Sequence, residues 1–131
     1  MENFVLKKTI LVALLSATPL ISFAQNWVFV TGNSNAADFY VDADSIKKIG
    51  ANRRVWVLQD LKKRTVNGSL SAKLLREIDC NEEKIRSLQF TFYAENMLKG
   101  EMMNTVTRTG EWEFVSPDSM NKDVLDAVCK K

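Results

Sequence analysis

Histidine is absent from this chain of 131 residues, and cysteine occurs only twice, at Cys80 and Cys129. Without histidine, the chain lacks the side chain that most often serves as a general base at neutral pH. Two cysteines without histidine also cannot supply the four ligands of a structural zinc site. The sequence therefore predicts no catalytic residues, no metal site and no cofactor.

Charge of one sign is not in excess either. Lysine and arginine number 18 and the acidic residues 16, so the net charge of +2 is far from that of a dedicated nucleic-acid-binding protein. Only two prolines and five glycines are present, and we find no Pro/Gly-rich linker and no internal repeat. This composition predicts one small domain that does not bind nucleic acid.

The only long hydrophobic stretch lies at the N-terminus and has the layout of a secretory signal. Lys7 and Lys8 precede an apolar core at residues 10–15, and the small residues Ser22 and Ala24 follow at the spacing of a cleavage site. The apolar stretch is too short and interrupted to span a membrane well. We therefore expect cleavage after Ala24.

Cleavage at that point divides the chain into a signal peptide, residues 1–24, and a single domain, residues 25–131. The destination is an oxidising compartment, the periplasm or the cell surface, and no later segment is apolar enough to cross a bilayer. In such a compartment the two cysteines of a small chain most simply form a disulfide. They lie too far apart for a Cys-x-x-Cys redox motif, so we predict a structural Cys80–Cys129 bond.

Short alternating runs punctuated by turn residues predict an antiparallel sheet. On the run from 70 to 80, five apolar residues share one face, and only Arg76 departs from the pattern. The expected strands cover residues 26–31, 39–41, 53–61, 70–80, 84–93, 103–109 and 111–115. We expect about six of them to form one sheet.

Two turns carry specific expectations. Asn67-Gly68 predicts a tight type I′ hairpin, because both residue types tolerate positive φ. Residues 42–50 predict one helical turn with an acidic start and a left-handed stop at Gly50. Asp42-Ala43-Asp44 has the spacing of the start of a calcium loop, but the glycine and glutamate that such a loop needs are missing, which favours a capping role.

In the last segment the spacing of the apolar residues changes from that of a strand to that of a helix. Ser116, Pro117 and Asp118 suit the start of a helix, and an apolar stripe follows at helical spacing up to Cys129. The stripe consists of Met120, Val124, Leu125 and Val128. The fold class is therefore predicted as α+β: a single antiparallel sheet of about six strands, with a C-terminal helix packed on one face and tied by the disulfide.

Several segments are also familiar as a set. They are the Trp27 strand, "FYVDADSI", "VWVLQDL", "SAKLLREIDC", the Gly110 and Trp112 pair, and the "SPDS…VC" end. Together they resemble the surface-adhesin protein E family of small secreted bacterial proteins. The resemblance implies a Gram-negative envelope protein with the predicted fold. It also implies an adhesin that binds host extracellular-matrix and plasma proteins.

Two groupings could carry catalysis. Glu111 and Glu113 would project on one face of a strand about 7 Å apart, a separation that glycosidases use. Ser69, Ser71 and Lys73 lie near one another, but a Ser-Lys nucleophile needs burial and an oxyanion hole. Solvated glutamates and turn serines are common, so we predict that the protein is not an enzyme.

The best candidate for partner binding is a cationic hairpin. Lys62, Lys63 and Arg64 precede the Asn67-Gly68 turn, and Lys73 and Arg76 lie on the returning strand. They could form a patch for an acidic protein partner. The alternative is a solvated hairpin whose charges discourage edge aggregation.

Two functions remain open at this point. The first is an adhesin-like module that binds extracellular or host proteins. The second is a soluble periplasmic protein, such as an inhibitor or an assembly partner of another envelope component. In either case Trp56 or Leu75 would point away from the helix, where a second chain could cover them and form a homodimer.

Overall fold

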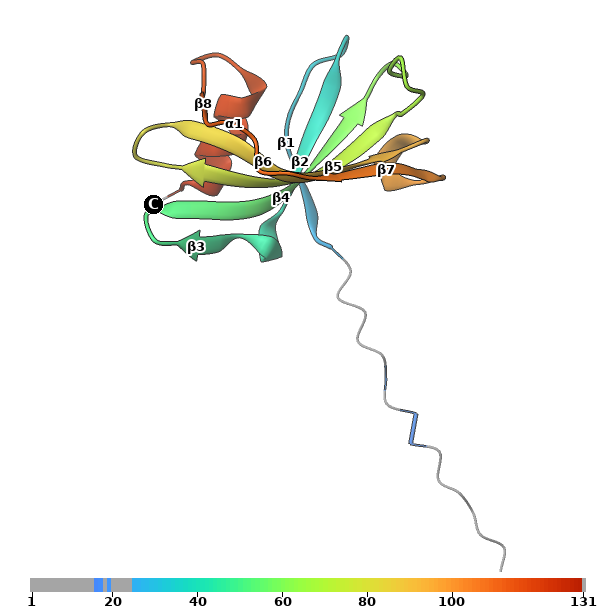
Figure 1. Ribbon diagram of the computed structural model, residues 1–131, viewed down its shortest axis with the longest axis horizontal. Helices are drawn as coiled ribbons and strands as arrows, with labels where there is room; N and C mark the ends of the chain where they lie inside the picture. The colour runs from blue at the N-terminus through green and yellow to red at the C-terminus, as the bar shows by residue number, and fades with distance from the viewer. Residues whose placement is uncertain (1–15, 18, 20–24, 131) are drawn as a thin grey trace, which may run out of the picture.

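The structure, a computed structural model, describes residues 16–17, 19 and 25–130. The predicted signal peptide lies almost wholly outside these residues, so its cleavage stays a prediction. Within the described chain, eight strands form one antiparallel sheet, and a single α-helix follows them (Figure 1). None of the described helices has the length and apolar character needed to cross a membrane.

Six strands make up the main sheet, in the order β1-β2-β4-β5-β6-β7, while the short β3 pairs with β4 and the short β8 with β6. The strands are β1 (Trp27–Gly32), β2 (Ala37–Asp42), β3 (Lys47–Ile49), β4 (Asn52–Leu61), β5 (Ser71–Asp79), β6 (Lys84–Tyr93), β7 (Met102–Thr107) and β8 (Glu113–Phe114). The helices are the 3-10 turns η1 (Ala43–Ser45) and η2 (Asn96–Leu98) and the α-helix α1 (Met120–Val128). The predicted antiparallel sheet with a C-terminal helix is confirmed.

The hydrophobic core lies between the sheet and α1. Strand alternation turns Val55 and Val57 of β4 toward the helix, and both are buried. The helix contributes Val124, Leu125 and Val128, three members of the predicted stripe, to the same cluster. Because α1 packs against β1 and β2 on one side only, the sheet has one face covered by α1 and one face without an α-helix.

The disulfide joins the end of α1 to the end of β5. Cys80 and Cys129 are bonded, with their Cα atoms 5.8 Å apart, and both pack against the core cluster. The predicted pairing is confirmed. It fixes Cys129, the residue that follows the helix, to the sheet, so the short helix is held at its C-terminal end by a covalent bond.

The hairpin between β4 and β5 differs in detail from the prediction. The backbone N–H of Gly68 donates to the carbonyl of Thr65 (2.9 Å), and the N–H of Thr65 donates to the carbonyl of Ser69 (2.9 Å). In this turn only Gly68 takes positive φ, at +90°. The prediction of a two-residue type I′ turn is wrong: the loop has three residues, with glycine at its left-handed position.

Residues 42–50 form less helix than expected. A 3-10 turn, η1, ends at Ser45, and the next residues form β3, which pairs with the start of β4. Gly50 does take positive φ, at +60°, but in the tight turn between these two strands. The helix α1 also begins later than predicted, after Ser119, whose hydroxyl accepts a hydrogen bond from the N–H of Lys122 (3.1 Å).

Candidate binding site on the helix-free face

The sheet face opposite α1 is here called the outer face. Strand pairing determines which outer-face residues are neighbours: Leu58 of β4 lies between Tyr40 of β2 and Lys73 of β5. Two residues earlier on β4, Trp56 lies opposite Leu75 of β5. These residues alternate with the core residues of the same strands, so they point away from the helix.

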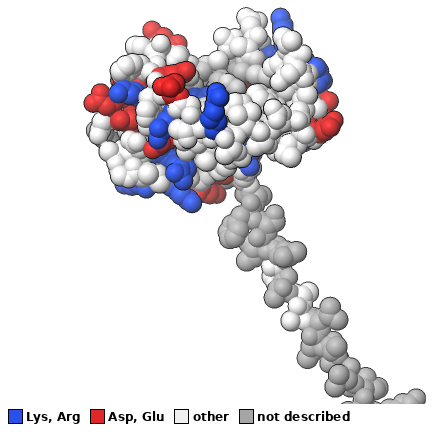
Figure 2. Space-filling model, in the orientation of Figure 1, with Lys and Arg blue, Asp and Glu red and all other residues white. Residues whose placement is uncertain are grey.

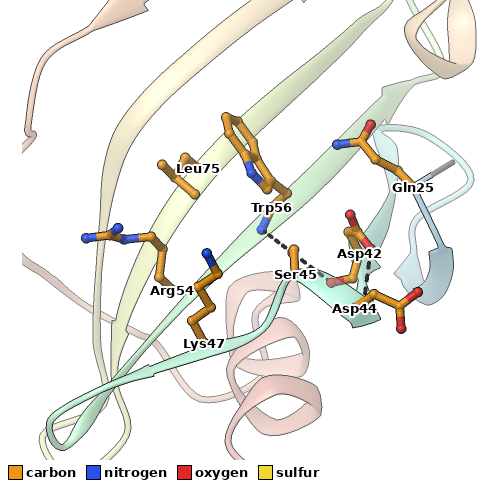
Figure 3. Close-up of a pocket in the computed structure, with 8 residues that line it drawn as sticks. All are labelled: Gln25, Asp42, Asp44, Ser45, Lys47, Arg54, Trp56 and Leu75. Carbon is orange, nitrogen blue, oxygen red and sulfur yellow. Dashed lines mark hydrogen bonds between the residues drawn. The ribbon is translucent and has the colours of Figure 1, made fainter. Parts of the chain in front are cut away.

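A hollow of about 520 Å³ opens on the outer face where η1 and β3 meet β4 and β5 (Figure 3). Its lining combines aromatic, aliphatic, cationic and acidic side chains. The lining residues are Gln25, Asp42, Asp44, Ser45, Lys47, Arg54, Trp56 and Leu75. A mixed, open hollow of this kind suits a protruding side chain of another protein better than an enclosed small molecule.

The wall of the hollow at η1 is built by side-chain capping. The Asp42 carboxylate accepts hydrogen bonds from the backbone N–H groups of Asp44 and Asn26, both at 3.2 Å. The Ser45 hydroxyl donates to the carbonyl of Asp42 (2.8 Å) and accepts from the N–H of Trp56 (3.0 Å), as Figure 3 shows. The turn is thereby attached to β4 beside Trp56, which fixes the backbone on both sides of the hollow.

The cations at and beside the hollow form no salt bridges within the described chain. The Lys73 ammonium lies 4.5 Å from the centre of the Trp56 ring, a cation–π contact. Lys47 lies opposite Arg54 in the β3–β4 ladder, and the Nε of Arg54 is buried without a hydrogen-bond partner among the described residues. Lys47, Arg54 and Lys73 make no salt bridge with any described residue. Arg54 lies opposite Glu77 in the β4–β5 ladder, and its positive charge helps to lower the pKa of that carboxyl.

A second outer-face cluster is internally satisfied. The Arg86 guanidinium lies 4.4 Å from the centre of the Trp112 ring and donates two hydrogen bonds to Glu77, at 2.9 and 2.6 Å. Asn52 donates to the other oxygen of the Glu77 carboxylate (3.2 Å). Burial alone would raise the pKa of Glu77, but these hydrogen bonds outweigh it and lower the pKa. This cluster therefore stabilises the sheet and offers a partner less unpaired charge.

The family model described as Surface-adhesin protein E matches residues 27–130. The chain belongs to the surface-adhesin protein E family. No curated protein sequence matches it closely enough to count as a relative.

Solved structures show the same fold. Crystal form II of Haemophilus influenzae protein E has a TM-score of 0.63 and 15% identity, covering 79% of this chain and 86% of that one. Protein E from non-typeable Haemophilus influenzae has a TM-score of 0.60 and 15% identity, covering 85% and 80%. At such low identity the likeness concerns the fold, and no binding residue can be carried over from these structures.

In this family member the five residues of the predicted cationic hairpin patch do not lie together. Residues 62–64 are exposed at the hairpin, but two of them are engaged. The Lys62 ammonium lies 2.7 Å from Asp38, and this hydrogen bond raises the pKa of Lys62. The Arg64 guanidinium donates to the backbone carbonyl of Ala94 (2.6 Å), so it helps hold the hairpin against the end of β6.

Lys73 and Arg76 lie on opposite faces of β5, because they are an odd number of residues apart. Lys73 lies over Trp56 on the outer face. Arg76 points to the covered side and lines a cavity of about 140 Å³, also lined by Glu113. Burial lowers the pKa of Arg76, and the charge of Glu113 partly opposes this effect. The five predicted residues do not form one patch, and their role in binding stays a prediction.

The two serines considered for catalysis have structural partners, while Glu111 and Glu113 both line the small cavity beside Arg76. The Ser71 hydroxyl donates to the carbonyl of Glu95 and accepts from the N–H of Leu98, so it fastens the η2 loop. Ser69 hydrogen-bonds within its own turn. Lys73 stacks on Trp56, away from these contacts. In the described part of the chain, no group of three or more acidic, cysteine or histidine residues is arranged to hold a metal.

The hollow itself was missed by sequence reasoning. Arg54 and Trp56 alternate with the buried valines of β4, so the sequence contained the signal that they share the outer face. The position of Lys47 could not be foreseen, because the sequence predicted a helical turn where β3 forms. Without β3 the cations appear scattered along the sequence.

Figure 2 shows the resulting distribution of charge. Blue side chains gather along the lower edge of this view, over β3 and the adjoining part of β4. This region includes Lys47, Lys48, Arg53 and Arg54, which β3–β4 pairing places side by side. A chain whose overall charge is nearly balanced thus has a locally cationic edge beside its exposed hollow.

Proposed function

We propose that this family member is a non-enzymatic, adhesin-like module that binds an extracellular protein through the hollow on its outer face. The observation that carries the proposal is a set of three cations without salt bridges to described residues: Lys47 and Arg54 line the hollow together with Trp56, and Lys73 lies over the Trp56 ring. Such a set suits an acidic segment of a partner protein, with an apolar side chain seated against Trp56 and Leu75.

The chemistry of the hollow supports this reading. Tryptophan and arginine are the residues most enriched among those that dominate binding energy at protein interfaces. The outer face is not covered by α1, and the η1 turn fixes one wall of the hollow through Ser45 and Asp42. A preformed site loses little conformational entropy when a partner binds.

Membership of a surface-adhesin family and the predicted signal peptide support exposure outside the cytoplasm. The test is binding of the purified domain to a panel of immobilised extracellular-matrix and plasma proteins. We expect at least one of them to bind, and the double substitution Arg54→Glu/Lys73→Glu to weaken that binding at least tenfold, equivalent to about 1.4 kcal/mol. Raising the salt concentration should weaken wild-type binding, since exposed charges are screened within about 8 Å at physiological ionic strength.

Two further variants decide where binding occurs. Lys99→Glu/Lys130→Glu changes the charge equally at exposed positions outside the hollow and should leave binding unchanged. The triple substitution of Lys62, Lys63 and Arg64 by glutamate tests the hairpin. Loss of binding in the triple variant, with the hollow variant unaffected, would move the site to the hairpin.

The second function, a soluble periplasmic inhibitor or assembly partner, is favoured by one observation. Both cysteines of the chain form the disulfide, so neither is free to carry a lipid anchor. Fractionation of the parent cell separates the two proposals. Protease-accessible protein on intact cells supports the adhesin, whereas release by osmotic shock together with protease protection supports the periplasmic role.

A further inference from the structure

The cations of the outer face extend beyond the hollow. Strand register places one residue from each of four neighbouring strands in a single row: Lys47 of β3, Arg54 of β4, Glu77 of β5 and Arg86 of β6. Figure 3 shows Lys47 and Arg54 on the same side of the sheet as Trp56. Three strand spacings of about 4.8 Å separate the ends of this row, roughly 14 Å in all. The cationic surface therefore reaches from β3 to β6.

A second row lies two residues further along the same strands. Asp79 of β5 pairs with Lys84 of β6, and Lys84 pairs with Phe114 of β8. Ile85, next to Lys84, is buried in the core, so Lys84 and Phe114 point to the outer face. Phe114 is 77% exposed, and the Lys84 ammonium lies 5.0 Å from the centre of its ring. This row ends in an exposed aromatic side chain beside a cation.

The acidic residues of the two rows are already engaged. The Glu77 carboxylate is buried and accepts the hydrogen bonds described above. The Asp79 carboxylate accepts two hydrogen bonds, both of 3.0 Å, from backbone N–H groups of the following turn. By contrast, Lys47, Arg54 and Lys84 form no salt bridge with a described residue. An anionic ligand that approaches this face thus meets more available cations than available carboxylates.

Aromatic rings hold several of these cations in place. Three cation–π contacts occur in the described chain, and all three lie on the outer face: Lys73 on Trp56, Arg86 on Trp112 and Lys84 on Phe114. Because the cations rest against rings that belong to the sheet, they lose less conformational freedom when a ligand binds. The outer face therefore presents a partly preorganised array of positive charge.

We infer that a sulfated polysaccharide chain binds along these two rows. Its sulfate groups contact Lys47 at one end and Lys84 at the other, and a sugar ring packs against Phe114. Ammonium and guanidinium groups form strong, charge-assisted hydrogen bonds to oxyanions. The exposed aromatic ring supplies an apolar surface for the C–H groups of a sugar. A linear chain fits because the rows cross several strands, whereas the hollow accommodates a single protruding side chain.

Two other polyanions fit these residues less well. Nucleic acid bases stack on free aromatic faces, and here a cation occupies one face of each of the three rings. An anionic lipid surface attracts basic side chains that protrude toward it, whereas Arg54, Lys73 and Lys84 are half-buried. Both ligands are included in the test as competitors.

This ligand differs from the protein partner proposed above, although the two sites share residues. Lys47 and Arg54 line the hollow, but Lys84 and Phe114 do not. Substitution of Lys84 and Phe114 therefore alters the polysaccharide site and leaves the hollow intact. Failure of one proposal can be distinguished from failure of the other.

The test is a titration of a fluorescently labelled heparin hexasaccharide with the purified domain. A heparin disaccharide is too short to contact both ends of the rows at once, so the hexasaccharide should bind about tenfold more tightly or better. Lys84→Gln/Phe114→Ala should weaken hexasaccharide binding by about fivefold or more. The matched control is Lys63→Gln/Val66→Ala, an exposed cation and an exposed apolar residue of the hairpin, which should stay within about twofold of wild type.

The salt dependence separates the charged contacts from the apolar one. Each lost contact between a cation and a linear polyanion should lower the slope of log affinity against log salt by roughly 0.7. Lys47→Gln and Lys84→Gln should each show this change. Phe114→Ala should weaken binding with an unchanged slope, because it removes no charge. Circular dichroism of each variant confirms folding.

Three results would overturn the inference: no binding of the hexasaccharide, equal losses in the hairpin control and in Lys84→Gln/Phe114→Ala, or equally tight binding of single-stranded DNA or anionic lipid vesicles. Loss of the hexasaccharide in Arg54→Glu/Lys73→Glu alone would also contradict it, since the sugar would then occupy only the hollow. Lys84→Gln/Phe114→Ala should still bind the matrix or plasma protein, so the protein site can stand or fall separately.

Discussion

The two faces of the sheet are stabilised by different means. On the covered face, buried aliphatic residues of the strands meet Val124, Leu125 and Val128, and the Cys80–Cys129 bond fixes the helix. On the outer face, cations lie over aromatic rings, and the Lys73–Trp56 pair borders an open hollow. The same strands supply both faces, because alternate residues point in opposite directions.

This difference separates stability from recognition. Burial of apolar area provides most of the stability of a small domain, and the covered face supplies it. Half-buried cation–π contacts such as that of Lys73 with Trp56 contribute less to folding than the buried aliphatic core, so the residues that form them can be devoted to a partner. Substitutions on the two faces should therefore have opposite consequences: loss of stability on one face and loss of binding on the other.

Removal of the disulfide should have the largest effect on the covered face. Cys80→Ala/Cys129→Ala should lower the free energy of unfolding by about 2–5 kcal/mol, because it frees the end of a short helix. Urea unfolding measures the change, and wild type under reducing conditions is the matched control. A loss below about 1 kcal/mol would mean that α1 is held by hydrophobic contacts alone.

Glu77 lies on the outer face but is expected to contribute to stability. Glu77→Gln should cost roughly 1–3 kcal/mol at pH 7, since the carboxylate accepts charge-assisted hydrogen bonds from Arg86. The folded-state pKa of Glu77 is lowered, so its contribution is full above the ordinary value of 4.5 and is lost as the pH falls through the lower folded-state value.

Urea unfolding between pH 7 and pH 3 tests this prediction. The difference between wild type and Glu77→Gln should shrink below pH 4.5. A difference that stays constant down to pH 3 would contradict the assignment of the acid-sensitive contribution to this carboxylate.

Arg76 is a charged residue on the apolar side, and its Nε has no hydrogen-bond partner among the described residues. Arg76→Met should leave the free energy of unfolding unchanged or raise it by about 1 kcal/mol, because desolvation of a buried charge offsets its attraction to Glu113. Lys63→Met, at an exposed position, is the control. A loss above about 1 kcal/mol would show that Arg76 organises this side of the sheet.

The smallest effect should come from Lys73 on the outer face. Lys73→Met keeps the aliphatic stem over Trp56 and removes only the ammonium, so the cost should be about 0.5 kcal/mol. The same variant should weaken binding through the hollow. If stability falls by more than about 2 kcal/mol, the Lys73–Trp56 pair belongs to the folding core, and the contrast between the two faces fails.

Features set by strong local patterns could be predicted from the sequence. The alternation in β4, β5 and β6, the helical stripe and the cysteine pair led to the sheet, the helix and the disulfide. Weak local signals failed: β3 has three residues and depends on pairing with β4, which no propensity reveals. The three-residue hairpin loop likewise depends on which strand residues pair around Gly68.

The hairpin patch shows why site prediction is harder. Proximity in sequence grouped Lys73 with Arg76, while the two-residue strand period separates them onto opposite faces. The hollow requires residues from β3, β4, β5 and the η1 turn to come together. That arrangement follows from sheet register, which the sequence sets only through tertiary contacts.

The central claim is that partners bind to the outer face, and the three tryptophans of the chain report on it directly. The measurement is a two-dimensional NMR titration of the indole N–H signals, assigned by Trp→Phe variants, with the matrix or plasma protein that binds in the panel. The account predicts that the Trp56 signal shifts or broadens first and most, ahead of Trp27 and Trp112. An unchanged Trp56 signal at a saturating concentration of that protein would contradict it.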